Sequence, residues 1–166
     1  VFHLIGDGAK REELQSAAVK AGLDSVIFLG RKDKSEIPGL LRASNACLVH
    51  LKESELFKTV LPSKMFEAMA MKRPVILGVA GDAARVLSEA QGGICIDPEN
   101  EEQLIDAMTT LKQDPVLAAT FSEKGYQYVM RHHDRDDLAA DYLELVSRVA
   151  RRGAPVESSR VTSTTS

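Results

Sequence analysis

Short apolar runs alternate with amphipathic segments along the first hundred residues of the chain. Five runs rich in aliphatic and β-branched residues predict strands at residues 1–5, 26–29, 46–51, 75–77 and 94–96. Between them, apolar residues at helical spacing predict helices at residues 9–21, 36–43, 63–72 and 82–90. Three further helices are predicted at residues 101–112, 115–130 and 136–150. The Ser/Thr-rich stretch from residue 153 to 166 has no periodicity and is expected to be disordered.

This alternation predicts an α/β fold, a Rossmann-like, doubly wound parallel sheet followed by C-terminal helices. The strands show little polar alternation, as strands covered on both faces do. Residues 1–152 are expected to form one domain. In such sheets ligands bind at the carboxyl ends of the strands. This rule selects the loops at residues 6–8, 30–35, 50–63 and 78–82.

Composition excludes several classes of function. A hydrophobic content of 44% and a charged content of 27% are typical of a soluble globular protein. The net charge of -3 does not indicate nucleic-acid binding. No apolar run approaches the roughly 20 residues that span a bilayer, and no signal-peptide pattern opens the chain, so we expect a cytoplasmic location. Cys47 and Cys95 lie in apolar runs without a CxxC pattern, so no metal site is expected.

Two apparent motifs have plainer interpretations. Gly6 and Gly8 follow a strand as in a dinucleotide-binding loop, but the third glycine of that pattern would fall on Arg11. The glycines then serve a tight turn. His132, His133 and Asp134 resemble a catalytic cluster, yet neighbouring residues on a helix point apart, and we expect them at a solvated helix start.

Polar residues follow three of the predicted strands at the ligand-facing edge. His50 ends a strand there, although a single histidine at a strand end is more often structural than catalytic. Arg31 and Lys34 follow another strand and could neutralise a phosphate, or could be ordinary surface cations.

The stretch at residues 61–77 combines a helix start with chemistry. Pro62 and Ser63 open a helix, with Ser63 predicted as its N-cap, and Pro74 prevents the helix from continuing. Free N–H groups at a helix start attract phosphate, Lys64 adds a cation, and Glu67 could accept hydrogen bonds from sugar hydroxyls. From the local sequence alone, structural roles for these three residues are more common than ligand binding: a serine that caps the helix, a solvated lysine and an ordinary glutamate in the first turn.

Three segments in this order carry a resemblance to a known family. They read Phe-His-Leu-Ile-Gly-Asp-Gly at residues 2–8, Val-Ile-Phe-Leu-Gly at 26–30, and Pro-Ser-Lys-Met-Phe-Glu-Ala-Met-Ala-x-x-x-Pro-Val-Ile at 62–76. Over residues 1–149 the chain resembles the C-terminal half of the GT-B fold, the nucleotide-sugar-binding domain of family 4 glycosyltransferases (glycosyl transferases group 1). The resemblance implies a retaining, metal-independent transferase whose donor is a nucleoside-diphosphate sugar, with no other cofactor. The Pro-Ser-Lys variant is similar to lipopolysaccharide and capsule transferases, which implies a bacterial cell-surface glycan pathway.

The resemblance also implies roles for particular residues. The family has two glutamates separated by seven residues; Glu67 matches the second, which contacts the donor ribose, whereas the first falls on Thr59. Either Thr59 hydrogen-bonds the sugar, or Glu53 or Glu55 supplies a carboxylate, or the activity is altered. Thr59 and Glu67 are thus the implied catalytic positions. The implied substrate-binding set is Gly6, Gly8, Arg31, Ser63, Lys64, Met65 and Glu67.

Part of the family's domain is expected upstream of Val1. Residues 1–5 resemble the second strand of that domain, so the first strand and its diphosphate-clamping loop would precede them, as would the acceptor-binding domain. Any peripheral membrane association would involve that missing domain. The absent strand would lie between residues 1–5 and 47–49, and the isolated chain is expected to be inactive. The alternative is a Rossmann-like module that binds a nucleotide sugar or a protein without chemistry, and Thr59 favours it.

Overall fold

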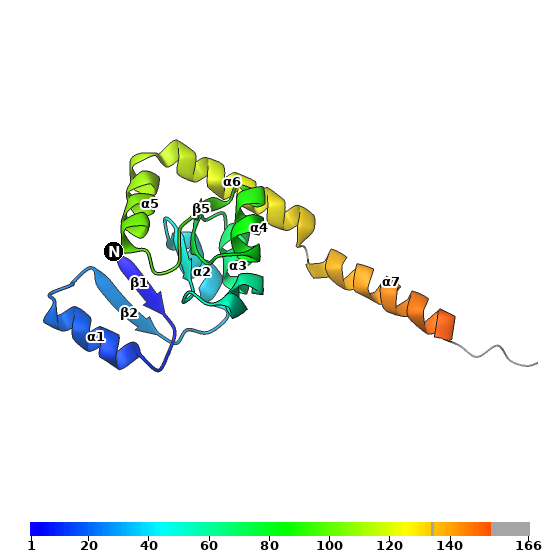
Figure 1. The fold of residues 1–166 in the computed structure, drawn as a ribbon, viewed down its shortest axis with the longest axis horizontal. Coiled ribbons are helices and arrows are strands. Elements are labelled where there is room, and N and C mark those ends of the chain that lie inside the picture. Colours follow the sequence, from blue (N-terminus) through cyan, green and yellow to red (C-terminus); the bar gives the residue numbers. More distant parts are fainter. Residues whose placement is uncertain (134, 154–166) are drawn as a thin grey trace, which may run out of the picture.

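A computed structural model of the chain describes residues 1–133 and 135–153, and its elements alternate as the sequence predicts (Figure 1). The strands are β1 (Phe2–Ile5), β2 (Val26–Gly30), β3 (Cys47–His50), β4 (Val75–Gly78) and β5 (Gly93–Cys95). The helices are α1 (Arg11–Lys20), α2 (Ile37–Ala43), α3 (Ser63–Ala70), α4 (Asp82–Ala90), α5 (Glu101–Gln113), α6 (Pro115–His132) and α7 (Arg135–Gly153), with a short 3₁₀ helix η1 (Glu55–Thr59) before α3. The predicted disordered tail lies outside the described residues, apart from Gly153, which ends α7.

All strand pairs are parallel, but the strands form two sheets. One sheet has the order β1-β2 and the other β3-β4-β5. Within the described residues, β1 and β3 each pair along one edge only. β1 and β3 are also the two strands between which the family resemblance implies a further strand. In Figure 1 the β1-α1-β2 unit stands beside the larger unit.

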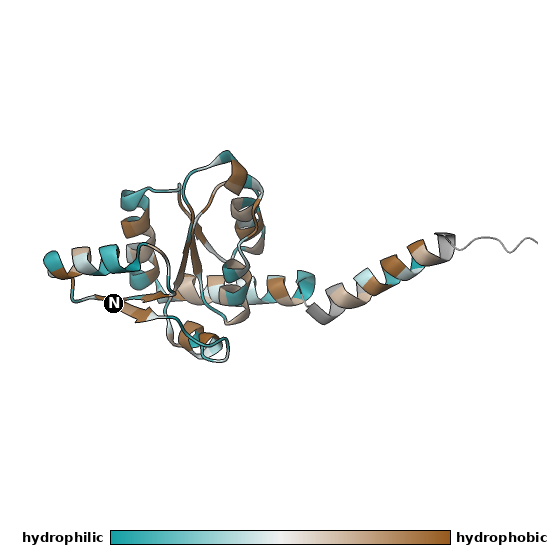
Figure 2. Ribbon diagram, turned by 90° about the horizontal axis from the view of Figure 1, so that it is seen from below, coloured by the Kyte–Doolittle hydropathy of each residue, from teal (hydrophilic) through white to brown (hydrophobic). Residues whose placement is uncertain are grey.

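The strand β4 is the centre of the larger sheet, and its four residues are all buried. Successive side chains of a strand point to opposite faces. Val75 and Leu77 pack with residues of α3 and α4, while Ile76 packs with Ala107 and Leu111 of α5. Helices therefore cover both faces of this sheet, as a doubly wound fold requires. Figure 2 shows these strands as hydrophobic ribbons between helices whose outer surfaces are more polar.

The two ends of the chain are packed less closely. Leu4, Ile5 and Ile27 of the smaller sheet are about two-fifths exposed, at 40%, 39% and 40%. Helix α7 extends away from the body, and its residues Tyr142 and Val149 are exposed (Figure 1). None of the helices in the described part of the chain is both long and apolar enough to cross a membrane.

The predicted helix start at residues 132–134 is wrong for His132 and His133, while Asp134 lies outside the described residues. His132 is the last residue of α6, and His133 follows it as the C-cap. His133 is half-buried, with its ring centroid 4.3 Å from that of Phe66 in α3. The sequence pattern missed this contact because the two residues lie far apart along the chain.

Candidate functional site

Helix α3 begins one residue earlier than a Ser63 cap would require. Pro62 is the N-cap, with extended backbone angles (φ -66°, ψ 121°), and no side chain caps the helix. The prediction of Ser63 as N-cap is therefore wrong: Ser63 is the first helical residue. The N–H of Met65 donates to Pro62 O at 3.1 Å, whereas those of Ser63 and Lys64 have no recorded protein acceptor in residues 1–133 and 135–153. These two free donors lie at the positive end of the helix dipole.

The spacing of apolar residues in α3 determines which side chains face solvent. Met65, Ala68 and Met69 are completely buried and form the inner stripe of the helix. Ser63, Lys64 and Glu67 are exposed. Because residues three and four apart lie on one helical face, these three side chains form a single outward surface. Within the described residues, no hydrogen bond or ion pair engages the carboxylate of Glu67, which leaves it open to a ligand.

Met65 does not share this exposed surface, although it was predicted to bind substrate. Its side chain has 0% exposure and belongs to the core between α3, β4 and α4. Its N–H is taken by Pro62. The side chain of Met65 therefore cannot reach a ligand in this arrangement; it packs α3 against the sheet.

Thr59, at the position of the family's first glutamate, is exposed and ends η1. Its hydroxyl donates to the carbonyl oxygen of Leu56 at 3.4 Å, within the same turn. Glu55 forms an ion pair with Lys58, and hydrogen bonding to Glu55 raises the pKa of Lys58. The side-chain carboxylate of Glu53 makes no recorded hydrogen bond or ion pair in the described part of the chain. Of the three candidates, Glu53 thus has the least engaged side chain.

The loop of residues 51–62 is fixed where η1 meets the start of α4. A Cβ added to Gly81 would overlap the carbonyl oxygen of Lys58, so the two backbones are in close contact. Gly81 also has a φ of 79°, which favours glycine. The chain enters α3 directly after this contact, so the contact helps to position Thr59 and Ser63.

The remaining predicted residues lie at the carboxyl end of the smaller sheet. Gly6 follows β1 and donates its N–H to the carbonyl oxygen of Gly30 at 2.9 Å. Gly8 has open space around it, and Arg31 follows β2 and is exposed. The predicted set is thus divided between the two sheets, with Gly6, Gly8 and Arg31 on one and Ser63, Lys64 and Glu67 on the other.

Arg11 is a cation at this end that sequence reasoning did not assign to a site. Its guanidinium lies against Gly30, where an added Cβ would be 3.4 Å from Nη2. Nη1 is 3.5 Å from a carboxylate oxygen of Asp7, while Nε is buried without a partner. The sequence indicated only that Arg11 is too large for a dinucleotide loop; its direction toward Gly30 depends on how α1 packs.

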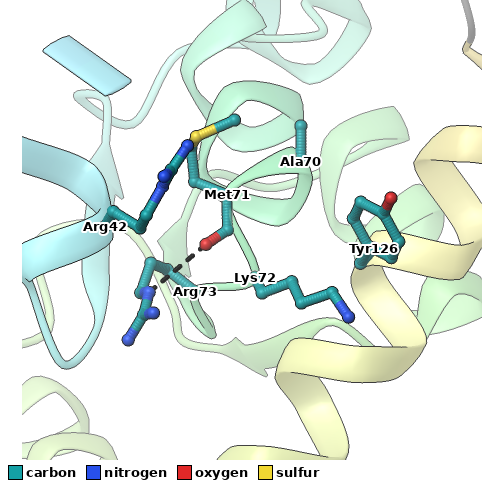
Figure 3. A pocket seen from close by; sticks show the side chains of 6 residues that line it. All are labelled: Arg42, Ala70, Met71, Lys72, Arg73 and Tyr126. Atoms are coloured by element: carbon teal, nitrogen blue, oxygen red, sulfur yellow. Dashed lines mark hydrogen bonds between the residues drawn. The ribbon is translucent and has the colours of Figure 1, made fainter. Parts of the chain in front are cut away.

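A hollow of about 270 Å³ lies elsewhere, near the amino ends of β3 and β4. Figure 3 shows its lining residues Arg42, Ala70, Met71, Lys72, Arg73 and Tyr126. Arg73 donates to the carbonyl oxygens of Met71 and Ser44, and Lys72 pairs with Glu123 at 2.8 Å. Two of its cations therefore serve structural contacts. Among the residues that the structure describes, no cluster of three His, Cys, Asp or Glu side chains could hold a metal ion.

Comparison with known proteins finds glycosyltransferases among the relatives of this chain. The chain is 26% identical over 151 residues to the lipopolysaccharide core biosynthesis glycosyltransferase LpsD of Rhizobium meliloti (strain 1021), covering 90% of this chain and 42% of LpsD. The C-terminal domain of the glycosyl transferase group 1 family protein LpcC from Francisella tularensis is 29% identical with a TM-score of 0.62, covering 75% of this chain and 63% of that one.

A further likeness concerns the fold. Anabaena HepE, solved with UDP-glucose, is 23% identical and has a TM-score of 0.77, covering 88% of this chain and 40% of HepE. The chain thus spans less than half the length of LpsD and of HepE. The family model of glycosyl transferases group 1 matches residues 1–128. The chain therefore belongs to the glycosyl transferases group 1 family.

Proposed function

We propose that this chain is the donor-binding part of a glycosyltransferase that uses a nucleoside-diphosphate sugar in making a bacterial cell-surface glycan. The observation that carries the proposal is the exposed start of α3, where two free N–H groups, the ammonium of Lys64 and the carboxylate of Glu67 share one face. The structure of HepE with UDP-glucose supports the donor class. The similarity to LpsD supports the glycan class.

Each group at the start of α3 suits a different part of such a donor. The N–H groups of Ser63 and Lys64 and the positive end of the helix dipole would bind the diphosphate. Glu67, one turn into the helix, would accept hydrogen bonds from the ribose hydroxyls. Negative charge develops on the diphosphate as it leaves, so fixed dipoles and a cation stabilise the transition state. We infer a retaining, metal-independent transfer on this basis and from the family resemblance.

We propose that Glu53 supplies the carboxylate that the family's first glutamate would provide at residue 59. The hydroxyl of Thr59 donates within its own turn, and Glu55 is paired with Lys58. Glu53 lies in the same loop with its carboxylate exposed. Catalysis would also need an acceptor-binding domain, which we expect in the full-length protein. We propose that the reaction takes place in the cytoplasm and that any contact with a membrane is made by that domain.

Calorimetry on the full-length protein tests this function. UDP-glucose, GDP-mannose and ADP-glucose would be titrated in turn, and hydrolysis of the donor that binds would be followed. We expect Glu67→Gln to weaken donor affinity by about tenfold, because it removes a charged acceptor. Glu12→Gln, on the exposed surface of α1, is the matched control. Unchanged affinity in the Glu67 variant would show that the ribose assignment is wrong.

A second candidate is a module that binds the nucleotide sugar without chemistry. The observation that favours it is Thr59, whose side chain carries no charge where the family has a carboxylate. Tight donor binding by the full-length protein without donor hydrolysis or transfer would support this candidate. Hydrolysis that is lost in Glu53→Gln would support the enzyme.

A further inference from the structure

His50 ends β3, and its ring lies across the neighbouring strand at Gly78. The two residues are register partners in the β3-β4 pair. A Cβ on Gly78 would lie 2.5 Å from Cδ2 of His50, so a side chain at residue 78 would displace the ring. Glycine at residue 78 therefore leaves the space that the ring occupies at the carboxyl edge of the sheet.

The ring of His50 accepts a hydrogen bond from the loop after β5. The N–H of Glu99 donates to Nε2 at a distance of 2.8 Å. Glu99 has a φ of 60°, in the left-handed region that few non-glycine residues adopt. The residue that donates to His50 is thus one with a sparsely populated backbone conformation.

Glu99 in turn holds the start of the loop at residues 51–62. Its carboxylate oxygen Oε2 accepts a hydrogen bond from the N–H of Glu53 at 3.2 Å. The end of β3, the loop after β5 and the start of the 51–62 loop are thus joined by two hydrogen bonds. Each bond connects residues more than 40 positions apart in the sequence, at separations of 49 and 46.

We propose that His50 is a positioning residue for the donor site, acting through Glu99 on the 51–62 loop. A second point of that loop is already held by the contact between Lys58 and Gly81. With the loop held at Glu53 and at Lys58, we expect Glu53, Thr59 and the start of α3 to keep one relative arrangement. The identity of the ligand in this inference rests on the proposed function, whereas the anchoring of the 51–62 loop by His50 and Glu99 is independent of it.

The experiment uses the full-length protein and two readouts. Hydrogen exchange of peptides covering residues 51–62 measures how firmly the loop is held, and calorimetry with UDP-glucose measures binding. His50→Leu keeps bulk but removes the acceptor; His50→Gln keeps an acceptor at similar reach. His3→Leu, an exposed histidine on β1, is the matched control. Urea unfolding confirms that each variant is folded.

We expect His50→Leu to speed exchange in the loop and to weaken UDP-glucose binding about tenfold, because misplaced binding groups lose affinity. His50→Gln should restore both, and His3→Leu should change neither. Glu99→Ala should reproduce the effect of His50→Leu, and combining the two should add little, because both act through one connection. Glu99→Ala also provides the test if His50→Leu does not fold.

Two results would overturn the inference. Unchanged loop exchange in both His50→Leu and Glu99→Ala would show that the connection does not anchor the loop. Faster exchange with unchanged UDP-glucose affinity would show that the anchor does not position the site. If the wild-type protein bound none of the tested nucleotide sugars, the proposed function would fail, while the exchange data would still decide the anchoring.

Discussion

The carbonyl oxygen of Lys58 occupies the space that a side chain on Gly81 would need. This contact joins η1, which precedes the candidate site, to the start of α4, which packs on the buried strand β4. Glycine at residue 81 thus serves both a left-handed backbone conformation and a close approach of two backbones. The loop that leads to α3 is thus held beside the buried core around β4.

Gly81→Ala is expected to destabilise the fold by more than the cost of placing alanine at the backbone angles of Gly81 (φ 79°, ψ -135°). That conformational cost is about 1–3 kcal/mol, and the clash with Lys58 adds to it. Gly22→Ala is the control, since Gly22 has a similar φ of 66° and nothing within 4 Å of its added Cβ. Free energies of unfolding in urea compare the two. Equal decreases in the free energy of unfolding of the two variants would show that the contact with Lys58 does not contribute to stability.

The role of Met65 can be separated into packing and binding. Met65→Ala should lower the free energy of unfolding by about 2–5 kcal/mol, because it leaves a cavity in the core. Met65→Leu conserves volume and should cost less than about 1.5 kcal/mol. We expect Met65→Leu to bind UDP-glucose as tightly as the wild-type protein does. A clear loss of affinity in this variant, with stability retained, would mean that the side chain contacts the donor.

The sequence predicted the parts of the fold that depend on local pattern. The apolar run at residues 75–77 and Pro74 before it located β4 correctly, because burial on both faces leaves a continuous hydrophobic segment. The sequence pattern predicts the N-cap of α3 one residue too late, at Ser63 instead of Pro62, because both residues suit a helix start. The bonds from Glu99 to His50 and from Glu53 to Glu99 could not be predicted. They depend on which strand ends become neighbours, and no local pattern carries that information.

The contact between His133 and Phe66 should make stability depend on pH. Burial lowers the pKa of His133, with a smaller contribution from the nearby His132. The unfolded chain then takes up the proton more readily than the folded one, so this contribution to stability is complete above about pH 6.5. It declines as the pH falls through the lowered pKa of the folded state. Urea unfolding of the wild-type protein and of His133→Phe, between pH 7.5 and 5, measures the difference.

His133→Phe keeps an aromatic ring beside Phe66 but cannot be protonated. Its stability should fall less between pH 7.5 and 5 than that of the wild-type protein. His3→Phe, at an exposed position on β1, controls for the loss of a histidine. Parallel curves for the wild-type protein and His133→Phe would argue against a contribution from His133.

The unpaired edges of β1 and β3 predict where a further strand would bind. Phe2 and Gly6 donate toward β2, and Cys47 and Leu51 donate toward β4. Because donors alternate along a strand, the N–H groups of His3 and Leu48 point to the opposite, unpaired edges. We expect both amides to exchange rapidly with solvent in this chain, and Val49, which is buried beside β4, to exchange slowly.

A strand that lay between β1 and β3 in the full-length protein would pair with both edges at once. The amides of His3 and Leu48 should then become protected together, while that of Val49 stays slow in both forms. Amide exchange followed by nuclear magnetic resonance, on this chain and on the full-length protein, provides the comparison. Protection of only one of the two amides would indicate a separate partner for that edge. Rapid exchange of both in the full-length protein would mean that the two sheets remain apart, and that the gap between them is a property of the native fold.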